Sequence, residues 1–281
     1  MSMAQAIESF VPDGSTVAMG TALEALIPFA AGHEIIRRRR RNLNLVGPIS
    51  DALFDQLIGA GCVDRITAAW LGNVSEGLGH CYRRAAEQGI PRSIVIHDHT
   101  NFSIALALWA AAWNVPYIPT RTLLGSDILN TNPNLAKDGD LVRVHAVRPD
   151  VAIVHVQRCD IDGHAHPWGP HGITEEAALA SGGVIVTCEE IVDSDSLFRH
   201  PNRILFPETK VVAVVHEPGG AHPAPVQNFF GRDHAFFRDY ATESRTREGF
   251  EAWLQRWVLD VPDRAAYLSR IDLEALRAGR E

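Results

Sequence analysis

The chain has 281 residues, of which 46% are hydrophobic, so it is long enough to bury the core of a sizeable globular domain. Its formal net charge is −8, and this acidic balance argues against a sequence-independent nucleic-acid binder, because such proteins are usually basic. Its four cysteines are far apart and form no CxxC pair, which indicates neither a disulfide framework nor a zinc knuckle.

The start of the chain, SMAQAIESFVPDG, lacks the basic segment and the long apolar core of a signal peptide. The longest apolar run, at 103–113, is too short to cross a bilayer and predicts a buried helix. We therefore expect a soluble, cytoplasmic protein with no membrane or nucleic-acid partner.

Strand-like and helix-like segments alternate through the first half of the chain. The second predicted helix starts with a Ser/Asp cap, and glycines end it. The basic run RRRRR at 37–41 fits the solvated C-terminal turn of a helix, with a phosphate or nucleic-acid patch as the alternative. The predicted strands are 15–20, 42–48, 63–72 and 93–99, and the predicted helices are 22–40, 50–61, 78–89 and 101–114.

The alternation continues after Asp150. The expected strands are 150–160, 184–192 and 210–220, with a short helix at 174–183. These runs are rich in Val and Ile and nearly continuous, which is typical of parallel strands covered by helices on both faces. The sequence therefore predicts one α/β domain over 1–281, built on an open, doubly wound parallel sheet. The amphipathic segment at about 245–281 should form helix across the sheet or against a partner.

Polar loops follow most of the predicted strands. In open α/β sheets, ligands bind beyond the carboxyl ends of the strands. These loops hold more glycine, serine and acid than strand-to-helix turns need, so they are candidates for a ligand site. They are Gly20–Thr21, GPISD at 47–51, GNVSEGLG at 72–79, HDHTN at 97–101, RTLLGSD at 121–127 and DIDGHAHP at 160–167.

Five segments carry a resemblance to a known family. They are DGSTVAMG…LEALIP, AAWLGNVSEGLGHCYRRAAEQG, VPYIPTRTLLGSD, VRPDVAIVHVQRCDIDGHA and VIVTCEEIV…PGGAHP. In this order they resemble the α subunit of family I CoA-transferases, especially the glutaconate type. A related branch contains thioester-dependent hydrolases that open steroid-derived rings. The resemblance implies a CoA-transferase type of parallel sheet, an acyl-CoA substrate, no cofactor beyond coenzyme A as part of that substrate, and a β subunit in an α2β2 or similar heteromer. It also implies a nucleophilic glutamate on the β subunit, which forms a mixed anhydride and then a glutamyl-CoA thioester.

The first candidate residues lie in two loops, the glycine loop after the first predicted strand and the loop after the third predicted strand. Gly20 and Thr21 match the loop whose backbone amides could hold a carboxylate or an oxyanion, although this chain has one glycine where the family has Gly-Gly-Phe. Ser75 and Glu76 resemble the Ser-Glu-Asn-Gly that carries the nucleophile in related transferases, but the Asn is missing. We therefore expect Ser75 and Glu76 to line the site, with Glu76 as nucleophile the alternative.

HDHTN bears on the hydrolase branch. The position of that branch's α-subunit glutamate matches Asn101, whose amide cannot act as a base, and Asp98 is a second candidate. His97 and His99 would share a face of a strand, so a metal site is the alternative there, although the resemblance implies none.

Two further segments contribute candidates. Arg121 could hold a substrate carboxylate or form a salt bridge, and Ser126 and Asp127 could line the site or cap a helix. The loop CDIDGHAHPWGPHG at 159–172 predicts a turn at the mouth of the site without metal, the alternatives being a metal site and a plain exposed turn.

The sequence thus predicts a CoA-transferase α subunit that moves coenzyme A between an acyl-CoA and a carboxylate. A hydrolase that cleaves a CoA thioester or a carbon–carbon bond is the first alternative, and a catalytically silent CoA-ester-binding module is the second. The loop at 217–225 should face a ligand or a partner, and we expect the aromatic run at 228–240 to form an interface rather than core.

Overall fold

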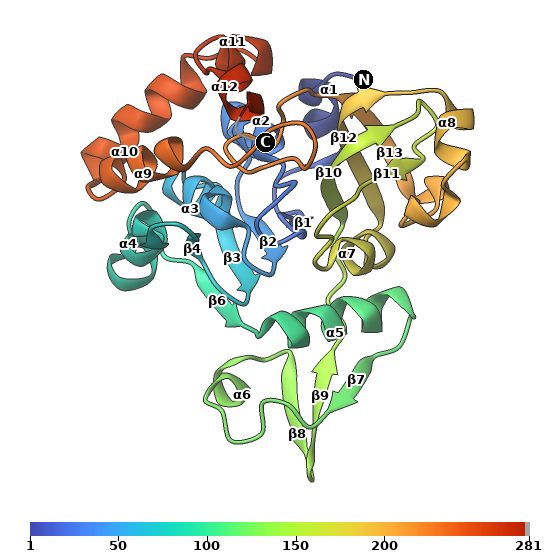
Figure 1. The fold of residues 1–281 in the computed structure, drawn as a ribbon. Coiled ribbons are helices and arrows are strands. Elements are labelled where there is room, and N and C mark those ends of the chain that lie inside the picture. The colour runs from blue at the N-terminus through green and yellow to red at the C-terminus, as the bar shows by residue number, and fades with distance from the viewer. Residues whose placement is uncertain (279–281) are drawn as a thin grey trace.

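In the computed structural model, which describes residues 1–278, an eight-stranded sheet runs through the centre of the molecule (Figure 1). The strand order is β13-β12-β10-β1-β2-β3-β6, with every neighbouring pair parallel, and the short β11 pairs antiparallel to β10. These strands are β1 (Thr16–Met19), β2 (Leu43–Gly47), β3 (Val63–Ala68), β6 (Val95–Asp98), β10 (Val151–Cys159), β11 (Ala165–His166), β12 (Gly183–Ile191) and β13 (Val211–His216). The predicted parallel sheet is confirmed.

The strand order reverses between β1 and β10. The chain builds outward from β1 through β2, β3 and β6, then returns to the other side of β1 with β10, β12 and β13. In doubly wound sheets this reversal leaves a crevice beyond the carboxyl ends of the two central strands. The loops that follow β1 and β10 therefore stand where a ligand is expected.

Helices cover both faces of the sheet, and the strands bury side chains toward both. Val17 and Met19 of β1 join one hydrophobic cluster, whereas Ala18 between them joins the other. This explains why the strand sequences are continuously apolar instead of alternating. The first cluster includes side chains from α1 (Met3–Phe10), α2 (Phe29–Arg37), α3 (Asp51–Gly59), α4 (His80–Gln88) and α9 (His234–Glu243), and the second from α5 (Asn101–Ala112) and α7 (Thr174–Ala180).

Helix α2 begins later than the predicted helix at 22–40. Leu23 and Leu26 have φ values of 70° and 53°, so the chain before Pro28 forms left-handed turns instead of a helix. The amide of Leu26 donates to the carbonyl of Pro225 at 3.1 Å, which holds this loop against a distant segment. The first part of the helix prediction was therefore wrong, because tertiary contacts fix the loop.

A small antiparallel sheet that sequence reasoning missed lies below the main sheet in Figure 1. Its order is β7-β9-β8, and it packs on α5 through the cluster of Ala107, Leu135, Val142 and Val144. Its elements are β7 (Tyr117–Thr120), α6 (Ile128–Thr131), β8 (Leu135–Asp138) and β9 (Leu141–His145).

The aromatic run at 228–240 belongs to the core of this chain. Phe236, Phe237 and Tyr240 are buried in the first hydrophobic cluster, and the Tyr240 hydroxyl donates to buried Asp55 at 2.6 Å. The expectation of an interface was wrong for these side chains, because the C-terminal helices supply the apolar surface that covers them.

Short helices occupy the predicted C-terminal segment, of which residues 279–281 lie outside the described part. The prediction of a single domain stays a prediction. Among residues 1–278, no helix combines the length and the apolar character needed to cross a membrane. The remaining elements are β4 (Gly72–Asn73), β5 (Gly77–Leu78), α8 (Ser194–Phe198), α10 (Arg247–Leu254), a π-helical turn (Gln255–Leu259), α11 (Arg264–Leu268), α12 (Leu273–Ala278) and 3-10 turns at Pro201–Arg203 and Glu208–Lys210.

Candidate active site

The loops that leave β1 and β2 pack directly against each other. Gly20 has a φ of 65°, and a Cβ at this position would lie 2.6 Å from Oγ of Ser50. The Ser50 hydroxyl donates to the carbonyl of Met19 at 3.1 Å. Gly20 is therefore required both by its left-handed backbone and by the close approach of the second loop. The predicted single-glycine loop is a tight, well-defined turn.

Thr21 supports this turn from inside. Its buried hydroxyl lies 3.0 Å from Oγ1 of Thr174, and its carbonyl accepts from the amide of Ile173 at 2.8 Å. The turn after β1 is thus attached to the start of α7. Because the Thr21 side chain is engaged within the chain, a substrate contact here would come from the backbone.

Ser75 and Glu76 form the exposed turn of the β4–β5 hairpin. Asn73 orders this turn: its Oδ1 accepts from the Ser75 amide at 3.2 Å and its carbonyl accepts from the Glu76 amide at 2.9 Å. The Asn73 side-chain amide also donates to the carbonyl of Phe237 at 2.8 Å. The chain therefore presents Ser75 and Glu76 to the outside on a fixed backbone, which we call the Ser75–Glu76 turn.

A buried ion pair lies beneath the Ser75–Glu76 turn. Nη2 of Arg232 is 2.7 Å from Oδ2 of Asp51, and Nε of Arg232 donates to Oγ of Ser75 at 2.9 Å. The guanidinium also stacks 3.8 Å above the Phe237 ring, and Oδ1 of Asp51 accepts from the Val74 amide at 3.0 Å. Burial raises the pKa of Asp51, while Arg232 and the Val74 amide oppose that rise.

Sequence reasoning missed the role of this pair. It treated Asp51 as part of a helix cap and placed Arg232 in an aromatic run without a partner. The only signal was the position of Asp51 at the end of β2, next to the glycine loop. Through Ser50 and Asp51 the structure brings Gly20, Thr21 and Ser75 together at one edge of the sheet.

Asp98 and Asn101 lie at the end of β6, and both are exposed. The Asp98 carbonyl accepts from the Asn132 side chain at 2.6 Å, so the small sheet packs next to this position. His99 is buried, with Nδ1 3.0 Å from Oγ of Ser103, and burial lowers its pKa to about 4. His99 is thus held inside the protein as a neutral side chain, whereas Asp98 and Asn101 remain accessible.

Arg121, Ser126 and Asp127 belong to the small antiparallel sheet and its loop. Nη2 of Arg121 is 2.8 Å from Oδ2 of Asp140, and both side chains are 76% exposed. The Ser126 hydroxyl donates to the carbonyl of Leu123 at 2.8 Å, and Asp127 occupies the position before α6 without a side-chain cap bond. These contacts match the salt-bridge alternative for Arg121. A substrate role for the three residues stays a prediction.

The turn after β10 is organised by one carboxylate. Oδ1 of Asp160 accepts from the amides of Asp162, Gly163 and His164 at 3.0, 2.9 and 2.9 Å, and Oδ2 lies 2.7 Å from Nδ1 of His164. Burial acts to raise the pKa of Asp160, but hydrogen bonds from Ser194 and His164 outweigh it and lower the pKa.

Two histidines of this segment, His164 and His166, have separate partners. His166 binds the carbonyl of His200 through Nε2 at 2.9 Å, away from His164. Within residues 1–278, Asp160, Asp162 and His164 form the one group whose ligand atoms are close enough for a metal, all within 4.8 Å. The Asp160 oxygens accept hydrogen bonds within the turn, so the predicted turn is confirmed, whereas its place at the mouth of the site and its lack of a metal stay predictions.

The loop at 217–225 is attached to a buried polar network. His155 is 2.9 Å from Oε1 of Glu189 through Nε2 and 2.8 Å from Oγ1 of Thr187 through Nδ1. Oε2 of Glu189 accepts from the amide of Gly219 at 2.8 Å, and buried Arg264 donates to the Gly219 carbonyl. These contacts fix where the loop crosses the molecule, seen in orange between β13 and α9 in Figure 1.

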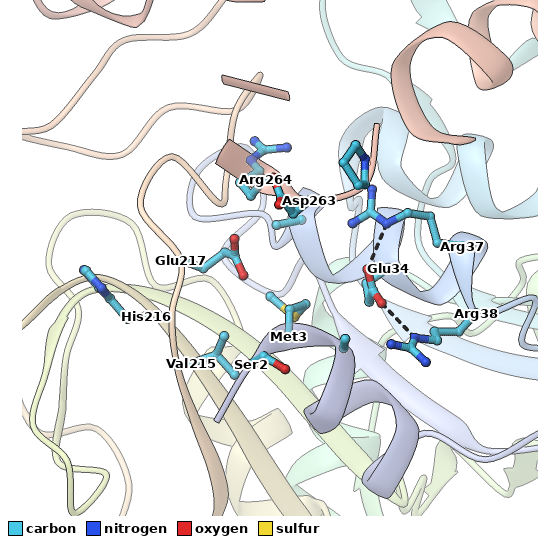
Figure 2. A pocket seen from close by; sticks show the side chains of 13 residues that line it. Ser2, Met3, Glu34, Arg37, Arg38, Val215, His216, Glu217, Asp263 and Arg264 are labelled. Atoms are coloured by element: carbon cyan, nitrogen blue, oxygen red, sulfur yellow. Dashed lines mark hydrogen bonds and ion pairs between the residues drawn. The ribbon is translucent and has the colours of Figure 1, made fainter. Parts of the chain in front are cut away.

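A separate polar pocket of about 280 Å³ lies between α1, α2 and the end of β13 (Figure 2). Figure 2 shows Glu34 between two arginines, with Oε2 2.8 Å from Nε of Arg37 and Oε1 2.9 Å from Nε of Arg38. Burial raises the pKa of Glu217 in the same pocket. Because Glu34 already pairs with both arginines and the pocket contains none of the predicted site residues, we assign it no substrate.

Comparisons with known proteins agree with the parallel sheet and its loops. The sequence model of the family described as Coenzyme A transferase matches residues 1–217. The A subunit of the 3-oxoadipate CoA-transferase of Pseudomonas knackmussii is 37% identical over an alignment of 277 residues, which covers 96% of this chain and 97% of that protein. The crystal structure of glutaconate coenzyme A-transferase from Acidaminococcus fermentans superposes with a TM-score of 0.90 at 28% identity, covering 98% of this chain and 93% of that chain. The cholesterol ring-cleaving hydrolase IpdA subunit of Mycobacterium tuberculosis is 30% identical over an alignment of 166 residues, which covers 54% of this chain and 57% of that protein.

Proposed function

Because this chain belongs to the coenzyme A transferase family, we propose that it is the α subunit of a heteromeric enzyme that moves coenzyme A between an acyl-CoA and a carboxylate. The observation that carries the proposal is the Ser75–Glu76 turn, which the chain builds with buried supports yet leaves exposed beside the Gly20 loop. A reactive thioester site must exclude water. A second chain that covers this edge would supply the enclosure.

In this proposal the partner provides the nucleophile. A glutamate of the partner attacks the thioester carbonyl, which forms a mixed anhydride and releases the CoA thiolate. The thiolate then attacks the glutamyl carbonyl of the anhydride, which gives a glutamyl-CoA thioester and releases the acyl group as a free acid. The Gly20 loop offers backbone amides near the reacting carbonyl, where developing negative charge would be stabilised. Glu76 lines the site, and its carboxylate as the nucleophile is the alternative.

We propose an acyl group that itself carries a carboxylate. The two transferases to which the chain is most fully aligned here are named for 3-oxoadipate and glutaconate, both dicarboxylic acids. Arg121 is the candidate for the distal carboxylate, since a guanidinium binds a carboxylate through paired hydrogen bonds. Substrate would have to displace Asp140 from Arg121, an exchange with little cost at so exposed a pair.

The hydrolase alternative is less well supported. The ring-cleaving relative aligns with only 54% of this chain, whereas the transferase relative aligns with 96%. Asn101, the residue that matches the hydrolase glutamate, carries an amide that cannot accept a proton at neutral pH. Asp98, three residues before Asn101, is the nearest carboxylate along the chain, and its side chain is exposed to water.

The remaining features of the proposal follow from this chemistry. We propose an α2β2 or similar heteromer that needs no cofactor other than the coenzyme A of its substrate. The four cysteines of the chain are buried and free, in keeping with the expected cytoplasmic setting.

The test is co-expression of the chain with the product of the adjacent reading frame, followed by assays with a panel of acyl-CoAs. We expect acyl-CoA consumption that depends on an added carboxylate and that follows ping-pong kinetics. Consumption without any acceptor would replace the transferase by the hydrolase. No consumption, with retained CoA-ester binding, would favour a silent binding module.

A further inference from the structure

A second cleft, of about 470 Å³, opens beside the carboxyl ends of β10 and β12 and is distinct from the Ser75–Glu76 turn. Its volume falls within the range typical of small-molecule sites. Aromatic and cationic side chains dominate its lining. The lining residues are Arg158, Trp168, Glu190, Asn228, Phe229 and Arg277. We call it the Trp168 cleft.

Hydrogen bonds fix both the backbone and the indole nitrogen of Trp168. The side chain of Gln157, which is fully buried in β10, accepts from the Trp168 amide at 3.1 Å and donates to the Trp168 carbonyl at 2.9 Å. The indole Nε1 donates to Oδ1 of Asn228 at 2.7 Å, and the Phe229 ring lies 6.3 Å away. A rigid, partly exposed indole loses little entropy when a planar ligand stacks on it.

Positive charge surrounds this indole. The guanidinium carbons of Arg158 and Arg203 each lie 5.7 Å from the Trp168 ring centre. Arg158 pairs with Glu190 at 2.7 Å, whereas exposed Arg203 forms no ion pair with any residue in 1–278. The cleft therefore combines an aromatic platform with a nearby arginine, Arg203, which contacts the indole from outside the lining and has no ion-pair partner within residues 1–278.

A second groove, of about 450 Å³, shares the lining residue Asn228 with the Trp168 cleft. Gly231 also lines this groove, and its neighbour Arg232 donates to Ser75 of the Ser75–Glu76 turn. The other lining side chains are mostly apolar or amide-bearing. They are Ala25, Pro170, Pro225, Gln227 and Phe230.

We propose that the Trp168 cleft binds the nucleotide end of the CoA thioester. This assignment rests on the proposed function. Adenine stacks on Trp168, and Arg203 and Arg158 bind the phosphates. The pantetheine arm, which is uncharged and partly apolar, lies along the groove past Asn228 and carries the thioester to the Ser75–Glu76 turn. The binding energy of this remote nucleotide then positions the reacting carbonyl.

The experiment uses the reconstituted two-subunit enzyme and compares acyl-CoA with the matching acyl-pantetheine, which lacks the nucleotide. For Trp168→Ala, we expect the KM for acyl-CoA to rise about 5- to 150-fold, the range for one lost stacking contact, while the KM for acyl-pantetheine stays unchanged. Arg203→Ala should raise the acyl-CoA KM and weaken its dependence on salt. Trp113→Ala, which removes a 62% exposed tryptophan from the end of α5, is the matched control.

An unchanged acyl-CoA KM in Trp168→Ala, or equal rises for both substrates, would overturn the assignment while leaving the transferase intact. Trp168→Phe keeps the platform and the fold, so its acyl-CoA KM should stay near that of the parent. If the parent complex shows no transferase activity, calorimetry with adenosine 3′,5′-bisphosphate still decides the cleft. Binding that is lost in Trp168→Ala supports the site, and no binding to the parent protein refutes it.

Discussion

Removing Arg232 should destabilise the protein because the change leaves the carboxylate of Asp51 buried without a partner. The Arg232 side chain is 12% exposed and that of Asp51 is fully buried, with 2.7 Å between Nη2 and Oδ2. Breaking one side of a buried pair costs about 3–5 kcal/mol. Since Arg232 also stacks on Phe237 and binds Ser75, Arg232→Ala loses three contacts at once.

The loss should depend on pH in a defined direction. Burial already raises the pKa of Asp51, and removal of the guanidinium raises the folded-state pKa further. Below the unfolded value of about 3.9 the carboxyl is neutral in both states, so the buried-charge penalty is absent. The stability deficit of Arg232→Ala therefore grows as pH rises from the unfolded value toward the raised folded pKa, levels off above it, and is at its full size at neutral pH.

Urea unfolding at several pH values, monitored by tryptophan fluorescence, measures this deficit. We expect a loss of about 3 kcal/mol at neutral pH and a smaller loss in acid. Arg238→Ala, at an exposed position of α9, should change stability by less than about 0.5 kcal/mol. The double variant Asp51→Asn/Arg232→Met should recover much of the loss. A deficit in Arg232→Ala below about 1 kcal/mol, or one that is independent of pH, would show that the pair is not a buried charge pair of this kind.

Two substitutions and one metal measurement test other parts of the structure. Gly20→Ala should lower both stability and exchange activity, since the new methyl would clash with Ser50 and the backbone φ is 65°. A normal melting temperature with full activity would contradict this. Glu189→Ala should cost about 2 kcal/mol or more in thermal unfolding, because it leaves His155 and the Gly219 amide buried without an acceptor; an unchanged Tm would count against the network. Metal analysis of untagged protein should find substoichiometric zinc, since Asp160 is engaged within its turn, and one equivalent of zinc would reverse that interpretation.

The main sheet was predictable because its strands bury both faces, which makes their sequences continuously apolar. Val17, Ala18 and Met19 illustrate this, as neighbouring side chains enter opposite clusters. The loop before α2 was not predictable in the same way. Its residues Leu23 and Leu26 are left-handed, Leu26 binds Pro225, and Thr21 binds the start of α7, and no local pattern records these contacts.

The candidate site was only partly visible in the sequence. Gly20 and the Ser75–Glu76 turn follow their strands directly, so strand ends point to them. Arg232 reaches Ser75 from 157 positions away, and its neighbours in the chain are aromatic core residues. Arg121 directly follows β7 of the small antiparallel sheet, which was missed because the pairing of β7, β8 and β9 depends on contacts that no local pattern records.

The most direct test of a shared thioester site is intact mass spectrometry of both chains after the reconstituted complex meets acyl-CoA. We predict a mass increase corresponding to coenzyme A on the partner chain, retained in the Glu76→Ala variant of this chain and removed by a carboxylate acceptor. An adduct on Glu76 of this chain would move the nucleophile here, and turnover without an adduct on either chain would contradict the transferase mechanism.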